Sequence, residues 1–164
     1  MPDELDVEIP DLSIIEFGAG ANPHPLANIH HDRILHSDWI DYAHDLTELP
    51  WPWEDEQFEG IVAIDVFEHL RGLDIPDWLN ECWRILKPDG FLMMRLPAWD
   101  NPTSWRDPTH YRVFHEQTFH YWDPEHELWT NFGRYYFQEF SRWWEIVQVF
   151  REAGDFRYDL KKRA

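Results

Sequence analysis

Residues 13–25, SIIEFGAGANPHP, combine a short apolar, β-branched run with two glycines and two prolines. A run of this kind, closed by glycine, is typical of a buried strand that ends in a tight turn. Pro23 and Pro25 disfavour a regular helix at the point where a nucleotide-binding loop normally begins one. The stretch therefore predicts a strand over residues 12–17, followed either by a cofactor-binding loop without its helix or by a turn alone.

Three further apolar segments each end at an aspartate, as the first strand ends near Glu16. Residues 27–31 stop at Asp32, residues 39–44 at Asp45 and residues 60–64 at Asp65. The link of ten residues between the first two strands is near the minimum length for a crossover and contains Pro23 and Pro25. The seven residues from Asp32 to Asp38 are too few for a helical crossover. We therefore expect shortened helices between the first strands and a short or irregular third strand.

Helical spacing replaces the strand pattern after residue 74. The expected buried stripe comprises Ile75, Leu79, Cys82 and Leu86, broadened by Trp78, Trp83 and Ile85. Asp74 is a suitable N-cap, and Pro88 ends the helix. Asp89-Gly90 then predicts a turn into a strand over residues 91–96, so residues 61–96 form a βαβ unit with parallel strands.

The second half of the chain is less regular. Residues 97–123 predict a long functional loop or lid with a short helix at 116–121. Four aromatic residues in this segment are candidates to close over a ligand: Phe114, Phe119, Tyr121 and Trp122. Residues 144–151 and 156–160 predict an antiparallel hairpin. With no internal repeat or linker, we expect a single α/β domain over residues 1–164 with an antiparallel C-terminal strand.

Composition excludes several classes of function. The formal charge of 14 − 32 = −18 opposes nonspecific binding to nucleic acid, and the 17% aromatic content favours a folded chain. No apolar run approaches the length of a membrane span, and the N-terminus has no leader pattern. Cys82 is the only cysteine, so an internal disulfide is excluded. A cytoplasmic protein that does not enter membranes is expected.

The acidic strand ends indicate a ligand class. In an open α/β sheet, ligands bind at the carboxyl ends of the strands. Gly18 and Gly20 allow a close approach of the backbone to a ligand, and Asp32 is placed to bind both hydroxyls of a ribose. These features also occur as a plain turn and as solvated caps, but their ordered combination favours a nucleoside.

At this point the sequence resembles the class I S-adenosylmethionine-dependent methyltransferases from about residue 12 onward. The segments that carry the resemblance are 16-EFGAG-20, 45-DLTELPWP-52, 65-DVFEHL-70 and 79-LNECWRILKPDGFLMMRLP-97. It implies a Rossmann-like fold, with S-adenosylmethionine as cofactor. The cofactor-binding residues that it implies are Glu16, Gly18, Gly20, Asp32, Asp45, Leu46 and Asp65. Asn22 departs from the family, which usually has a small residue there.

The acceptor side is expected in 106-RDPTHYRVFH-115. His110 is the candidate general base, although Asp107 and His110 can equally serve only to pin the loop through an Asx turn. His69 either contacts substrate or supports a group that does. We list His110, Asp107 and His69 as candidate catalytic residues.

A metal site is not expected from the sequence. The segment 30-HHDRILH-36 contains suitable donors, but His30 and His31 are adjacent on a strand and therefore point to opposite faces.

Two functions remain open. The first is a methyltransferase acting on an unidentified acceptor, expected to be a small molecule. The second is a non-catalytic module that binds S-adenosylmethionine, S-adenosylhomocysteine or a protein partner. The oligomeric state does not follow from the sequence.

Overall fold

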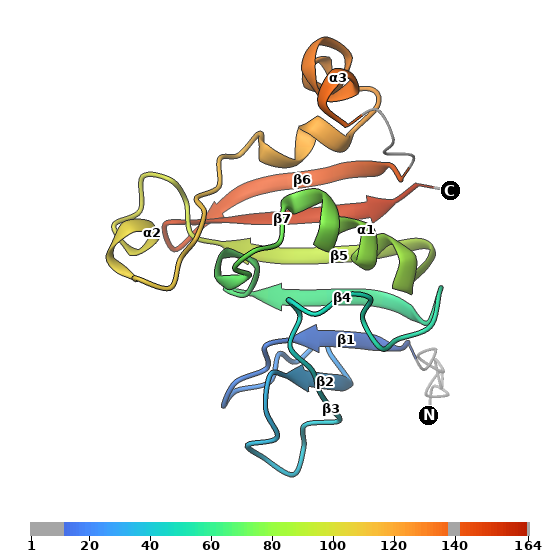
Figure 1. Ribbon diagram of the computed structural model, residues 1–164, viewed down its shortest axis with the longest axis vertical. Helices are drawn as coiled ribbons and strands as arrows, with labels where there is room; N and C mark the ends of the chain where they lie inside the picture. The colour runs from blue at the N-terminus through green and yellow to red at the C-terminus, as the bar shows by residue number, and fades with distance from the viewer. Residues whose placement is uncertain (1–11, 138–141, 164) are drawn as a thin grey trace, which may run out of the picture.

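The structure, a computed structural model, describes residues 12–137 and 142–163. Seven strands form one sheet in the order β3-β2-β1-β4-β5-β7-β6 (Figure 1). Their bounds are β1 (Ile14–Phe17), β2 (Ile29–Asp32), β3 (Tyr42–Ala43), β4 (Phe58–Ile64), β5 (Leu86–Leu96), β6 (Trp144–Glu152) and β7 (Asp155–Lys162). Strands β1 to β5 pair in parallel, whereas β7 lies antiparallel between β5 and β6. The expected mostly parallel sheet with an antiparallel C-terminal strand is confirmed.

The helices are few and mostly short. They are η1 (Phe67–His69), α1 (Ile75–Ile85), α2 (Thr103–Arg106), η2 (Thr118–Trp122), η3 (Trp129–Gly133) and α3 (Arg134–Tyr136). Helix α1 is the one expected after Asp74, whose backbone N–H donates to the carboxylate of Asp77, 2.9 Å away. No helix in the part of the chain that the structure describes could cross a membrane.

The junction between α1 and β5 differs from the sequence-based expectation. Leu86 already pairs with Phe58, and the register then shifts so that Phe91 pairs with Gly60. The expected turn at Asp89 is therefore a bulge inside a longer strand, with Asp89 at a φ of 63°. Pairing with β4 extends β5 toward its N-terminal end as far as Leu86. The strand therefore includes Asp89 and Gly90, although these two residues locally favour a turn.

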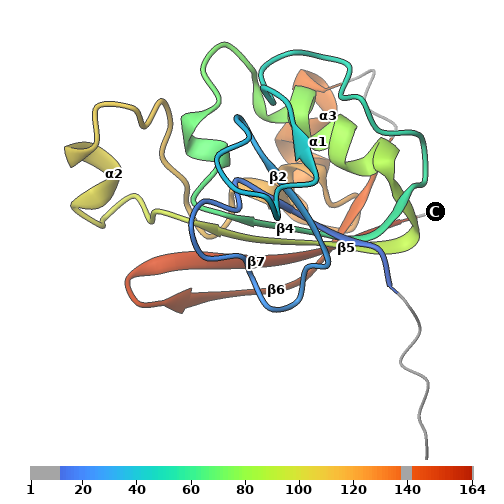
Figure 2. The same ribbon diagram turned by 90° about the horizontal axis from the view of Figure 1, so that it is seen from below.

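The short links between the first strands contain no regular helix, as expected from the sequence. Residues 18–28 and 33–41 contain no helix, and β3 is only two residues long. Helices α1 and α3 both lie on one side of the sheet (Figure 2). The opposite face carries a small apolar cluster of Ile14, Val62 and Met93. Parallel sheets usually have helices on both faces, so this chain is a reduced version of that architecture.

The main core lies between the sheet and α1. Trp78, Leu79 and Cys82 of α1 are buried against β1, β4 and β5, and Trp78 stacks on Phe67 with ring centroids 4.1 Å apart. Three of the four aromatic residues considered for a lid, Phe114, Phe119 and Trp122, are buried members of this core. The lid that we expected from these three side chains is therefore wrong, because their apolar rings contribute to the core instead.

Candidate cofactor pocket

A cavity of about 810 Å³ opens where the parallel strands end. Figure 1 shows this edge of the sheet at the left, where β1 and β4 end. The cavity is lined by Gly18, His31, Asp32, Arg33, His44, Asp45, Leu46, Thr47, Asp65, Val66, His69, Leu70, Arg71, Thr109 and Tyr111. Six of the residues proposed from the sequence thus surround one space: Gly18, Asp32, Asp45, Leu46, Asp65 and His69.

The glycine loop is bound to the neighbouring strand. The backbone N–H groups of Ala19 and Gly20 donate to the His31 carbonyl and to Asp32 Oδ2, over 3.0 and 2.9 Å. These two amides are therefore used within the protein and do not form an open cradle. Gly18 has a φ of 64°, and a Cβ there would lie 2.7 Å from Val66 Cγ2. Only glycine fits this approach between the first loop and the segment after β4.

Glu16 lies outside the large cavity. It lines a neighbouring space of about 300 Å³ together with Gly18, Ala19, residues 21–25 and Ile64, and Gly18 borders both spaces. Glu16 Oε2 accepts a 2.8 Å hydrogen bond from the backbone of His24 and lies 3.3 Å from His30 Nδ1. Its carboxylate shapes the loop that replaces the first crossover helix. Gly20 lines neither of these two cavities.

Asp32 is held in a fixed orientation at the end of β2. Its oxygens accept hydrogen bonds from the backbone of Gly20 and Arg33, and Oδ2 lies 3.3 Å from His36 Nε2. Partial burial alone would raise the pKa of Asp32, but these bonds lower it below its ordinary value. The side chain is an ionised acceptor at the cavity wall, with lone-pair capacity left for a ligand hydroxyl.

The segment after β3 forms an adjoining wall. Asp45 Oδ1 accepts hydrogen bonds from the backbone and the hydroxyl of Thr47, which lower the pKa of Asp45. Leu46 is buried, and its carbonyl accepts a 3.0 Å hydrogen bond from the indole of Trp51. This wall offers an apolar surface beside fixed polar groups.

Asp65 follows β4 with a φ of 55° and forms an ion pair with Arg95 of β5. It faces the cavity but shares its charge with that guanidinium. The pair couples the ends of the two central strands.

The predicted acceptor residues separate into two groups. His69 and Thr109 line the cavity, and His69 Nδ1 lies 3.0 Å from Thr109 Oγ1. The His110 side chain is only 7% exposed and does not line the cavity, and neither does Asp107. Asp107 Oδ1 accepts from the backbone and the hydroxyl of Thr109, which is the Asx turn considered from the sequence. Burial, followed by the proximity of His110, lowers the pKa of His69.

Glu68 was not singled out from the sequence. Its side chain is 1% exposed, and burial raises its pKa to about 8. Its position within 65-DVFEHL-70, one of the segments that carry the family resemblance, could have marked Glu68 as a site residue. The hydrophobic pattern of the sequence does not predict, however, that a glutamate in a 3₁₀ turn is buried. The structure places it beside both His69 and His110, 3.9 and 4.0 Å from their Nε2 atoms.

Comparison with known proteins gives one family match. Residues 21–94 match the model of a methyltransferase domain. No curated protein sequence matches the chain significantly.

Solved structures share the fold at low sequence identity. A SAM-dependent methyltransferase from Archaeoglobus fulgidus is 14% identical with a TM-score of 0.60, over 92% of this chain and 86% of that one. A SAM-dependent methyltransferase from Thermotoga maritima, described as a possible histamine N-methyltransferase, is 15% identical with a TM-score of 0.60. The match covers 96% of this chain and 84% of that one.

A third structure is phosphoethanolamine N-methyltransferase 1 from Haemonchus contortus, in complex with phosphoethanolamine and S-adenosylhomocysteine. It is 11% identical with a TM-score of 0.56, over 93% of this chain and 39% of that one. The resemblance found in the sequence is confirmed to this extent: residues 21–94 match a methyltransferase domain, and the chain has the fold of S-adenosylmethionine-dependent methyltransferases.

Proposed function

We propose that this protein is an active methyltransferase that binds S-adenosylmethionine in the 810 Å³ cavity and methylates a small-molecule acceptor. The observation that carries the proposal is the convergence of Gly18, Asp32, Asp45 and Asp65 on one cavity at the carboxyl ends of parallel strands. The volume lies within the range of about 300–1,000 Å³ that is usual for small-molecule sites.

The residues present fit a nucleoside cofactor. Asp32 offers an ionised carboxylate for ribose hydroxyls, and the buried Leu46 beside Asp45 offers an apolar surface for a purine ring. Gly18 leaves the space that a side chain would take. When bound, S-adenosylmethionine supplies an electrophilic methyl group, and the protein has to exclude water and align the acceptor with it.

The acceptor end of the cavity is assigned to His69, Thr109 and Tyr111, which line it and belong to the segments after β4 and β5. A cavity of this size suits a metabolite-sized acceptor, and the acidic surface disfavours a nucleic acid. The free, buried Cys82 agrees with a reducing compartment, and a cytoplasmic location stays a prediction.

The proposed roles of His110 and Asp107 change with this geometry. His110 is enclosed behind His69, with ring centroids 4.7 Å apart, so direct contact between His110 and an acceptor would require the loop to move. We assign Asp107 to the turn that holds Thr109, and we assign His69 as the residue of this set nearest to a bound acceptor.

The first test is calorimetry with S-adenosylmethionine and S-adenosylhomocysteine, on the wild type and on Asp32→Ala. Charge-assisted hydrogen bonds of about 1.5–3 kcal/mol are lost in the variant, so affinity should fall roughly ten- to a hundredfold. Asp38→Ala is the matched control, because Asp38 is an exposed acid in the loop that follows β2. Unchanged binding in Asp32→Ala with a loss in Asp38→Ala would move the ribose contact to Asp38. Absence of binding by the wild type would refute the proposal.

The alternative is a module that binds the cofactor without catalysis. The observation in its favour is the enclosure of His110, which leaves no histidine or carboxylate from residues 106–115 on the cavity wall. Incubation with methyl-labelled cofactor and a panel of amine and hydroxyl acceptors separates the two functions. Binding with no labelled product across the panel would support the alternative.

A further inference from the structure

Glu68 occupies an unfavourable position for an unassisted carboxylate. It is 1% exposed, and neither carboxylate oxygen accepts a hydrogen bond from another residue in the described ranges. Burial of an ionised carboxylate without a partner costs several kcal/mol. A buried acid that lacks donors is stable either in its protonated form or with a cation beside it.

Two histidines face this carboxylate from different parts of the chain. Glu68 Oε1 lies 3.9 Å from His69 Nε2 and 4.0 Å from His110 Nε2, and one donor atom from each of the three residues falls within 4.8 Å of the others. Donors around an ion with bonds of about 2.1 Å are about 3.0–3.4 Å apart. Rotations that move the donor atoms by less than about an ångström each would close the set around one ion.

The orientation of His69 is set by a hydrogen-bonded chain. Thr109 donates its hydroxyl proton to Asp107 Oδ1 over 2.6 Å, so Thr109 Oγ1 can only accept from His69 Nδ1. The proton of the neutral imidazole is therefore on Nδ1, which leaves the lone pair on Nε2, the nitrogen that lies 3.9 Å from Glu68 Oε1. Hydrogen-bonded partners of this kind orient histidine ligands in metal sites.

The backbone holds the two contributing segments together. The N–H of Tyr111 donates to the carbonyl of Glu68 over 2.8 Å, which ties the loop after β5 to η1 after β4. His110 is buried as well, and its Nδ1 has no hydrogen-bond partner in the described part of the chain. The cluster is thus a packed feature of the fold.

We propose that Glu68, His69 and His110 bind a divalent transition-metal ion at the wall of the cofactor cavity. Two imidazoles and one carboxylate form a donor set that suits Zn²⁺ and similar first-row ions better than Ca²⁺ or Mg²⁺. Three protein ligands leave at least one coordination position for water or for an oxygen of a bound molecule. This metal site is distinct from the segment at residues 30–36 that we considered in the sequence.

A consequence for catalysis rests on the function proposed above. Because His69 also lines the cavity, an acceptor oxygen bound to the ion would lie at the acceptor end, where the ion would lower the pKa of a hydroxyl. The hydroxyl could then lose its proton to solvent water before methyl transfer, so the enclosed His110 would not be needed as a general base.

The test is titration of chelator-treated protein with ZnCl₂ by calorimetry, without any methyl donor. The wild type should bind one ion per chain, and Glu68→Gln and His110→Ala should each weaken binding by more than about a hundredfold. Thr109→Val keeps the shape of the side chain but removes the acceptor for His69 Nδ1, so it should weaken binding about tenfold. Replacement by Co²⁺ should give a visible spectrum that Glu68→Gln abolishes.

His120→Ala is the matched control, since His120 and His126 form a second histidine pair with ring centroids 4.2 Å apart. That variant and Asp32→Ala should both retain Zn²⁺ binding, which separates this inference from the cofactor proposal. Circular dichroism checks that each variant is folded. Absence of stoichiometric binding by the wild type, or binding that survives Glu68→Gln and is lost in His120→Ala, would overturn the metal site.

Discussion

Gly18 matters both for the fold and for the candidate cofactor pocket, because a side chain at this position has no room. It borders both cavities at the end of β1, and its backbone has the left-handed conformation that other residues adopt only with strain. Val66, which follows β4, occupies the space into which a side chain would extend. The position is thus constrained twice, by backbone conformation and by packing.

Gly18→Ala should therefore lower the free energy of unfolding by about 2–4 kcal/mol, with about 1–2 from backbone strain and the rest from the contact with Val66. Gly72→Ala is the matched control, because Gly72 also has a positive φ but no atom lies within 4 Å of its added Cβ. It should lose only the strain contribution. Urea unfolding followed by tryptophan fluorescence measures both. Equal losses in the two variants would contradict the packing argument.

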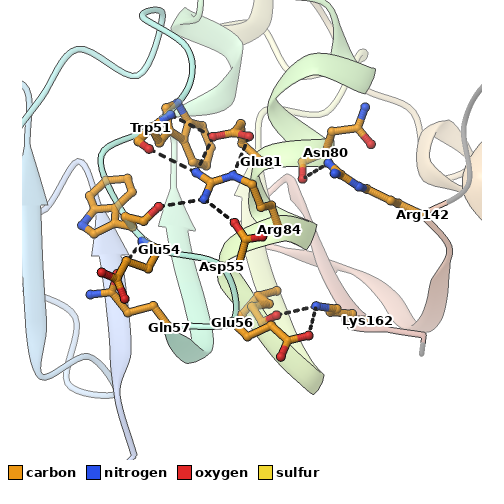
Figure 3. Close-up of polar contacts among 12 residues, drawn as sticks. Trp51, Glu54, Asp55, Glu56, Gln57, Asn80, Glu81, Arg84, Arg142 and Lys162 are labelled. Carbon is orange, nitrogen blue, oxygen red and sulfur yellow. Dashed lines mark hydrogen bonds and ion pairs between the residues drawn. The ribbon is translucent and has the colours of Figure 1, made fainter.

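At the scale of elements, α1 anchors the tryptophan-rich segment that precedes β4. Arg84 donates to the carbonyls of Trp51 and Trp53, and Glu81 accepts from Arg84 and from the backbone of Trp51, as Figure 3 shows in part. Burial alone would raise the pKa of Glu81, but these bonds lower it. Since Trp51 also donates to Leu46, the network indirectly supports the wall of the pocket.

Arg84→Met should cost about 3 kcal/mol of stability, because it leaves the mostly buried carboxylate of Glu81 without its cation. The double variant Glu81→Gln/Arg84→Met removes that unpaired charge and should be more stable than Arg84→Met alone. The free energies of the wild type and of both variants follow from denaturant unfolding. A double variant that is less stable than Arg84→Met would show that the buried charge is not the cause.

At the scale of the whole molecule, the net charge is −18, and three of the acids that contribute to it, Asp32, Asp45 and Asp65, line the pocket. The sulfonium of S-adenosylmethionine is positive, whereas S-adenosylhomocysteine lacks that charge. The field of the protein should therefore favour the methyl donor over the demethylated product.

Raising NaCl from about 0.05 to 0.5 M should weaken the affinity for S-adenosylmethionine severalfold, because the Debye length falls from about 14 to 4 Å. The affinity for S-adenosylhomocysteine should change less, and calorimetry at both salt concentrations measures the difference. Parallel losses for the two ligands would mean that the acidic field does not distinguish them.

The sequence by itself determined the parallel strands, the absence of the first crossover helix, the short third strand and the C-terminal hairpin. These features follow from hydrophobic periodicity, proline positions and segment length, which act locally. The convergence of Gly18, Asp32, Asp45 and Asp65 also followed, because carboxyl ends of parallel strands meet at one edge of the sheet.

Only the tertiary structure decided the direction of individual side chains. Glu16 faces the smaller cavity because His24 and His30 bind its carboxylate there, and the aromatic rings of Phe114, Phe119 and Trp122 pack into the core. The meeting of Glu68 with His110 depends on the return of a loop more than forty residues further along the chain. Such contacts depend on long-range packing, which local pattern does not encode.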